Sequence, residues 1–153
     1  MVHTLIIYDS AFGNTRHIAE AIAQTLEKQG TVRLVSVPDV DEIELTGLDL
    51  LILGCPTQGH GLTPAVRTLL DGIPRGSLEG LAALAFDTRY RMSEWLSGSA
   101  AHRIARKLQK AGARLILPAE SFFVVSREGP LEEGELERAG QWAEKAVEQF
   151  VSA

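Results

Sequence analysis

The chain has 153 residues, of which 45% are hydrophobic and 23% charged, with a net charge of −5 and a single cysteine. This length predicts one domain spanning residues 1–153. A single cysteine excludes an internal disulfide and fits a reducing cytoplasm. The apolar runs are too short for a membrane span. Twenty acidic residues against 15 basic ones argue against a nucleic-acid surface.

The first half of the chain alternates between strand and helix patterns. An apolar run at 4–8 predicts a strand, and residues 14–29 predict a helix with one apolar face that stops at Gly30. Residues 31–37 alternate in their first half, which is typical of an edge strand. Residues 48–54 are apolar apart from Asp49, as expected of a buried parallel strand. Around the start of the second of these strands, "PDVDEIELTGLD" holds most of the acidic excess. It is interpreted as a solvated loop, and the alternative is that its charge steers a basic protein partner.

The same alternation continues along the middle of the chain. Thr63 followed by Pro64 is a typical helix start, and "DGIP" ends that helix. The run 81–86 predicts a fourth strand. Ser99 is the expected cap of a helix that ends at Gly112.

The last part of the chain completes an α/β pattern. Residues 113–125 predict a fifth strand with a break expected at Pro118, and residues 135–150 predict the final helix. Five strands alternating with four helices predict a parallel sheet covered on both faces. Ligands bind such sheets at the carboxyl ends of the strands, near the point where the strand order reverses. The site is therefore expected just after Tyr8, Gly54 and Phe86.

The first of these loops, "DSAFGNT", is built to hold an anion. Ser10 and Thr15 offer hydroxyls, Asn14 offers an amide, and Gly13 allows a tight turn. A helix begins directly behind the loop, and the N–H groups and dipole at a helix N-terminus favour an anion. The loop lacks the Gly-Lys-Ser/Thr of a nucleoside-triphosphate loop and the Gly-x-Gly-x-x-Gly of a dinucleotide loop. It is therefore interpreted as a phosphate cradle of neutral donors.

The second and third loops suggest a planar ligand. "GCPTQGHGLTP" carries Gly54, Gly59 and Gly61, which leave the backbone free to approach a flat molecule. "FDTRYRMSEWLSGSA" carries Tyr90 and Trp95 in a polar context, where aromatic rings are available for stacking.

Together the three loops resemble those of the flavodoxin family. "YDSAFGNT" (8–15) is similar to the family's Ser/Thr-x-x-Gly-x-Thr phosphate loop, "LILGCPT" (51–57) to its second flavin loop, and "AFDTR" (85–89) to the third loop of short bacterial members. The resemblance covers essentially the whole chain. It implies a flavodoxin-like three-layer sandwich, with a five-stranded parallel sheet in order 2-1-3-4-5 and helices on both faces. It also implies that the protein binds FMN. No cluster of cysteine and histidine residues suggests a metal site.

The resemblance also implies roles for individual residues. Phosphate contacts are implied for Ser10, Ala11, Phe12, Gly13, Asn14 and Thr15, with Phe12 acting through its backbone N–H. One side of the flavin ring is implied for Pro56, Thr57, Gln58, Gly59 and His60. Gly59 is the candidate for a peptide that turns to accept a hydrogen bond from the reduced ring, and His60 is a candidate for stacking. The remaining ring contacts are implied for Asp87, Thr88, Arg89, Tyr90 and Trp95.

The function implied by the resemblance is electron transfer between redox partner proteins in a bacterial cytoplasm. The protein is expected to be a monomer or weak dimer that docks its partners through basic patches. Because Arg89 and Arg91 are expected near the ring, an FMN-dependent NAD(P)H or quinone oxidoreductase of the same fold remains an alternative interpretation. A domain that has lost FMN and acts in protein interaction is a third interpretation. A phospho-receiver domain is disfavoured, because the third strand ends in Gly54-Cys55 rather than in an aspartate, and Asp9 alone follows the first strand.

Overall fold

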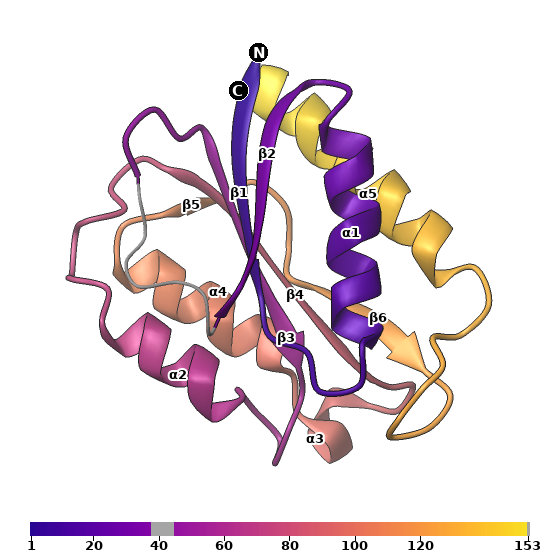
Figure 1. Ribbon diagram of the computed structural model, residues 1–153. Helices are drawn as coiled ribbons and strands as arrows, with labels where there is room; N and C mark the ends of the chain where they lie inside the picture. The colour runs from indigo at the N-terminus through magenta and orange to yellow at the C-terminus, as the bar shows by residue number, and fades with distance from the viewer. Residues whose placement is uncertain (38–44, 153) are drawn as a thin grey trace.

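The computed structural model describes residues 1–37 and 45–152, so that residues 38–44, which hold most of the acidic loop, lie outside the described residues. A twisted sheet lies between two layers of helices (Figure 1). The strands are β1 (Val2–Tyr8), β2 (Gly30–Ser36), β3 (Leu50–Pro56), β4 (Ala82–Tyr90), β5 (Arg114–Leu115) and β6 (Glu120–Val124). The helices are α1 (Asn14–Leu26), α2 (Pro64–Asp71), α3 (Glu94–Ser97), α4 (Ala100–Lys110) and α5 (Glu135–Ser152).

The sheet is parallel, and its order β2-β1-β3-β4-β5 confirms the predicted order 2-1-3-4-5. The predicted fifth strand is present as two pieces, because both β5 and β6 pair with β4. Pro118 lies between the pieces and lacks the N–H that a continuous ladder requires. The strand order reverses between β1 and β3, which places the expected site at the carboxyl ends of these two strands.

Two apolar cores lie on the two faces of the sheet. Because side chains alternate along a strand, Leu50 and Ile52 of β3 pack in the core beneath α1 and α5, whereas Leu51, Leu53 and Cys55 pack in the core beneath α2 and α4. All five are fully buried, as the apolar run predicted. None of the helices in the described part of the chain is long and apolar enough to cross a membrane.

Local signals explain where the helices begin. The Thr63 hydroxyl accepts a hydrogen bond from the backbone N–H of Val66, and Ser99 accepts one from that of His102, so both predicted caps are confirmed. The first helix ends at Leu26, one turn before Gly30, because residues 27–29 form a turn that leads into β2.

The fourth strand is longer than predicted and changes the geometry of the site. Residues 87–90 were expected to be loop, but they continue β4, since β6 pairs with Phe86–Tyr90. Strand alternation then directs Asp87 and Arg89 toward α4, while Thr88 lies on the α1 side. The short helix α3, which had no predicted counterpart, follows this strand.

Candidate functional site

A cavity of about 320 Å³ lies at the carboxyl ends of β1, β3, β4 and β6. This volume falls in the range of pockets that bind small molecules and cofactors. All three predicted loops contribute to its walls. The lining residues are Ser10, Ala11, Phe12, Asn14, Thr15, Pro56, Thr57, Gly59, His60, Thr88, Arg89, Tyr90, Met92, Leu96, Ser97, Val124 and Arg127.

The loop after β1 leaves several backbone donors free. Gly13 adopts φ 90°, a left-handed conformation that favours glycine, and this lets the chain turn directly into α1. The Ser10 hydroxyl accepts hydrogen bonds from the backbone N–H groups of Gly13 (3.1 Å) and Arg16 (3.3 Å). Among the described residues, no acceptor pairs with the backbone N–H groups of Ala11, Phe12, Asn14 and Thr15. Free donors at a helix N-terminus form a binding site for an anion.

Hydroxyl groups join the first and third loops at the floor of the cavity. The Thr15 and Thr88 hydroxyls lie 2.8 Å apart and form one hydrogen bond, and both side chains are almost completely buried. One of the two hydroxyls must donate and the other accept, so the accepting hydroxyl keeps a hydrogen for another acceptor. The pair therefore combines a structural contact with a donor directed at a ligand.

A fourth segment, the loop after β6, closes the phosphate end of the cavity. The Asn14 side chain donates to the carbonyl of Glu128 (3.2 Å), and a Cβ on Gly129 would lie 2.6 Å from the Asn14 amide oxygen. This close approach places Arg127 on the cavity wall. Arg127 forms no ion pair with any described residue, whereas Arg16, in the first loop's helix, pairs with Glu20 at 3.0 Å. Arg127 is thus a cation available to a bound anion.

The second loop turns tightly at the mouth of the cavity. The backbones of Gln58 and Gly61 exchange two hydrogen bonds of 2.9 Å, around Gly59 (φ 53°) and His60 (φ 67°). Two consecutive positive φ angles define a type I′ turn. In the described ranges, His60 is the only residue other than glycine with a positive φ. Such strain concentrates at functional sites, and both turn residues line the cavity, whereas the Gln58 side chain does not.

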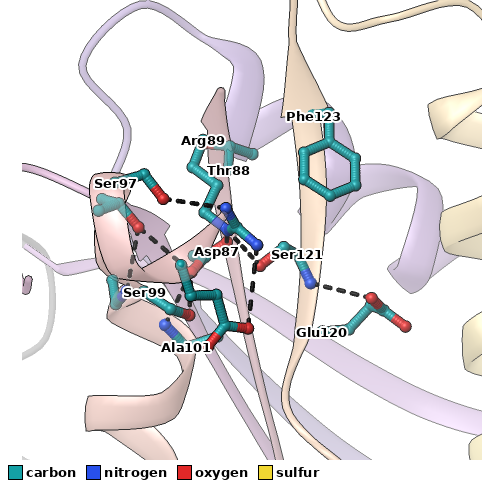
Figure 2. Close-up of polar contacts among 12 residues, drawn as sticks. Asp87, Thr88, Arg89, Ser97, Ser99, Ala101, Glu120, Ser121 and Phe123 are labelled. Atoms are coloured by element: carbon teal, nitrogen blue, oxygen red, sulfur yellow. Dashed lines mark hydrogen bonds and ion pairs between the residues drawn. The ribbon is translucent and has the colours of Figure 1, made fainter. Parts of the chain in front are cut away.

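Asp87 holds the loops together from beneath the cavity. Its Oδ2 accepts hydrogen bonds from the Thr57 hydroxyl (3.2 Å), the Ser99 hydroxyl (2.8 Å) and the backbone N–H of Ala101 (3.0 Å), and Figure 2 shows the Ser99 and Ala101 contacts converging on the carboxylate. Burial raises the pKa of Asp87, although the hydrogen bonds and Arg89 oppose this effect. Asp87 is fully buried and does not line the cavity, contrary to its predicted contact with the ring.

Arg89 is fixed in the wall by hydrogen bonds to neutral groups and by longer contacts with two carboxylates, of which Glu94 lies 3.9 Å away. Its guanidinium donates to the Ser121 hydroxyl (2.9 Å), the Met92 carbonyl (2.8 Å) and the Ser97 hydroxyl (2.9 Å), and it lies 3.9 Å from a carboxylate oxygen of Asp87. Figure 2 shows this side chain spanning from β4 to β6. The arginine joins β4, β6 and the α3 segment into one wall.

Two residues of the third loop that were expected near the ring, Trp95 and Arg91, lie outside the cavity wall in this structure. Trp95 has 90% of its surface exposed and does not line the cavity, while its neighbours Met92, Leu96 and Ser97 do. Arg91 also does not line the cavity, because its guanidinium pairs with Glu132 at 2.9 Å. Gly13 shapes the first loop without lining the cavity.

The sequence reasoning missed Val124 and Arg127, which lie at or just after the end of β6. The signal that could have found them is the topology rule already applied to the other strands. The carboxyl end of the fifth predicted strand must meet the same edge of the sheet.

Cys55 lies at the end of β3 but is not a reactive group. It is fully buried, and burial raises the pKa of its thiol to about 12. The thiolate is the reactive form of cysteine, so this shift makes the thiol unreactive near neutral pH. We expect alkylation by iodoacetamide to be negligible in the folded protein and rapid above the urea unfolding transition, as measured by mass spectrometry. Rapid alkylation of the folded protein would contradict this burial.

The chain was compared with known proteins. The family model described as Flavodoxin matches residues 6–150. A flavodoxin from Maridesulfovibrio salexigens is 33% identical over 121 residues, which cover 76% of this chain and 82% of that protein. The crystal structure of oxidised flavodoxin 2 from Bacillus cereus superimposes with a TM-score of 0.84 at 26% identity, covering 97% of this chain and 100% of that one. Oxidised flavodoxin 1 from Bacillus cereus gives a TM-score of 0.82 at 23% identity, covering 95% of this chain and 97% of that one. The chain therefore belongs to the flavodoxin family, whose members bind FMN.

Proposed function

We propose that this protein binds FMN in the cavity and carries electrons between redox partner proteins. The observation that carries the proposal is the group of free backbone donors at the start of α1, which opens into a cavity with apolar walls at its other end. A phosphate dianion fits the first part, and a flat ring system fits the second.

The donors at the phosphate end come from two loops. The N–H groups of Ala11, Phe12, Asn14 and Thr15 and the Thr15 hydroxyl, which the Thr88 hydroxyl holds in place, supply hydrogen bonds. Arg127 adds a positive charge that the sequence reasoning did not include. This combination neutralises the phosphate more completely than neutral donors alone.

The walls of the ring end come from the second and third loops. Pro56, Thr57 and the Gly59–His60 turn form one side, and Tyr90, Met92 and Leu96 are available on the other. Bound FMN supplies one- and two-electron redox chemistry, which the protein tunes by hydrogen bonds and charge. The Gly59 peptide, in a turn that glycine can invert at low cost, is the proposed acceptor of a hydrogen bond from the reduced ring.

The two arginines that supported the alternative interpretation as a reductase both have partners within the protein. Arg89 makes four hydrogen bonds within the wall, and Arg91 pairs with Glu132. Neither guanidinium is left to bind a nicotinamide nucleotide, which favours the electron carrier. We infer that it works in the bacterial cytoplasm as a monomer or weak dimer.

The test is a titration of the flavin-free protein with FMN, followed by stepwise reduction. We expect quenching of flavin fluorescence at a ratio of one FMN per chain, and electron delivery from the reduced protein to haem proteins. Absence of binding would favour the interpretation as a domain that has lost FMN. Oxidation of NAD(P)H by a quinone, faster than with free FMN, would instead identify a reductase.

A further inference from the structure

Helix α4 carries an uninterrupted row of basic side chains. Arg103, Arg106, Lys107 and Lys110 have the spacing i, i+3, i+4 and i+7, which places them on one side of the helix. The sequence of α4 contains no aspartate or glutamate. Arg75, after α2, shares a surface depression with Lys107 and Lys110. We call these five residues the basic face.

Most charges of the basic face have no ionic partner among the residues that the structure describes. Lys107 pairs with Asp71, but the side chains of Arg75, Arg103, Arg106 and Lys110 form no hydrogen bond or ion pair with any residue in 1–37 or 45–152. The whole chain nevertheless has a net charge of −5. The remaining ten of its 15 lysine and arginine residues are outnumbered two to one by 20 acids.

The basic face reaches the mouth of the cavity. A second depression is lined by His60, Glu94, His102, Arg103 and Arg106, with Glu94 contacting His102 at 2.9 Å, and His60 is also part of the cavity wall. Gly98, just before α4, packs directly against the backbone of His60, where a Cβ would collide with the His60 carbonyl group. The row runs from this point for about 10 Å along α4. A partner bound to it would therefore lie beside the cavity.

Exposed apolar side chains adjoin the same end of the basic face. Trp95 is 90% exposed, and Leu96 and Met92 are also exposed, in and before the short helix α3 that leads into α4. Protein interfaces combine such aromatic and methionine anchors with a charged rim. A nucleic acid would use the positive charges alone, and the acidic remainder of this protein would repel a long polyanion. The combination fits a compact acidic protein.

We propose that the basic face, with Trp95, docks an acidic redox partner protein beside the mouth of the cavity; this rests on the proposed electron-carrier function. Complementary charge would steer the encounter and orient the partner. With FMN bound, the flavin would give up one electron and a one-electron acceptor in the partner would gain it, while the basic face and Trp95 would hold that partner in place.

The experiment uses the FMN-loaded protein and two probes, an acidic b-type cytochrome and a basic c-type cytochrome. The variant Arg103→Gln/Arg106→Gln/Lys110→Gln removes three charges from the basic face. The control variant Lys28→Gln/Arg33→Gln/Lys145→Gln removes three exposed charges elsewhere, none of which lines the cavity. Transfer rates are measured by stopped flow at several salt concentrations, and equilibrium binding of each cytochrome is measured separately.

We expect transfer to the acidic cytochrome to slow with added salt, and to slow about tenfold in the face variant at low salt. The control variant should change this rate by less than about threefold, and FMN affinity should be unchanged in both. Trp95→Ala should weaken equilibrium binding of the acidic cytochrome without changing the salt dependence.

Two outcomes would overturn the docking proposal and leave the carrier function standing. In the first, the two triple variants slow transfer equally. In the second, transfer is faster to the basic cytochrome than to the acidic one, and the face variant does not change that rate. Binding of duplex DNA or anionic vesicles that requires the basic face, without binding of the acidic cytochrome, would also overturn it. If FMN does not bind, the carrier function fails, and equilibrium binding of the acidic cytochrome alone decides whether the face docks it.

Discussion

Replacing Asp87 with alanine is expected to lower the free energy of unfolding by about 3 kcal/mol. The carboxylate accepts hydrogen bonds from Thr57, Ser99 and the backbone N–H of Ala101. Alanine leaves these three donors without an acceptor at a position that is fully buried. Because Thr57 lines the cavity and Ser99 caps α4, we also expect the walls to loosen and FMN affinity to fall.

Asparagine at the same position is expected to preserve most of the stability, since its carbonyl oxygen can still accept at the Oδ2 position. The difference lies in the pH dependence. The folded-state pKa of Asp87 is raised above its ordinary value of 3.8, so the folded protein binds more protons than the unfolded chain between these two values. The contribution of Asp87 to stability is thus complete below about pH 3.8 and is lost as the pH rises through the folded-state pKa. The Asp87→Asn variant does not lose stability in this way, because asparagine does not ionise.

Urea unfolding of the wild type and both variants over a range of pH measures these effects. The advantage of the wild type over Asp87→Asn should shrink as the pH rises, while other carboxylates titrate equally in both proteins. Asp71→Ala is the matched control, because this exposed carboxylate pairs with Lys107 at the surface and should contribute little. An alanine variant as stable as the wild type would show that Asp87 does not hold the loops together.

The apolar patterns in the sequence predicted the sheet well, because local pattern and burial agree in these elements. The run at 48–54 became a strand that is buried on both faces, and the apolar stripe of 14–29 became the buried side of α1. The extent of β4 depends instead on its pairing with β6, more than 30 residues further along the chain. A local pattern carries no information about that partner, so 87–90 were read as loop.

The site shows the same division between local and non-local information. The phosphate loop could be recognised because its turn, hydroxyls and helix start lie within seven residues. The position of Trp95 depends on the rotation of α3 about its axis, which places Leu96 on the cavity and Trp95 in solvent. Asp87 looked like a ligand contact, but strand alternation in the extended β4 directs it toward α4 and below the cavity.

A second large effect should come from the ligand itself. Riboflavin, which lacks the phosphate, is expected to bind about 1,000-fold more weakly than FMN, because three charge-assisted hydrogen bonds of roughly 1.5 kcal/mol each would be lost. The free donors at the start of α1 and the Arg127 guanidinium supply these contacts. Titrations followed by flavin fluorescence give both dissociation constants. Similar affinities for the two flavins would show that the loop after β1 is an ordinary helix start.

Thr15→Val separates the ligand contact from the structural one. Valine keeps the shape of threonine but removes the hydroxyl, so FMN affinity should fall about tenfold while riboflavin affinity stays within about twofold. Thr88→Val is the matched control, since it breaks the same 2.8 Å hydrogen bond from the β4 side and keeps the Thr15 hydroxyl. In Thr88→Val, the ratio of FMN affinity to riboflavin affinity should therefore remain close to that of the wild type. If both variants lowered this ratio equally, the pair would act by joining α1 to β4 and not by binding the phosphate.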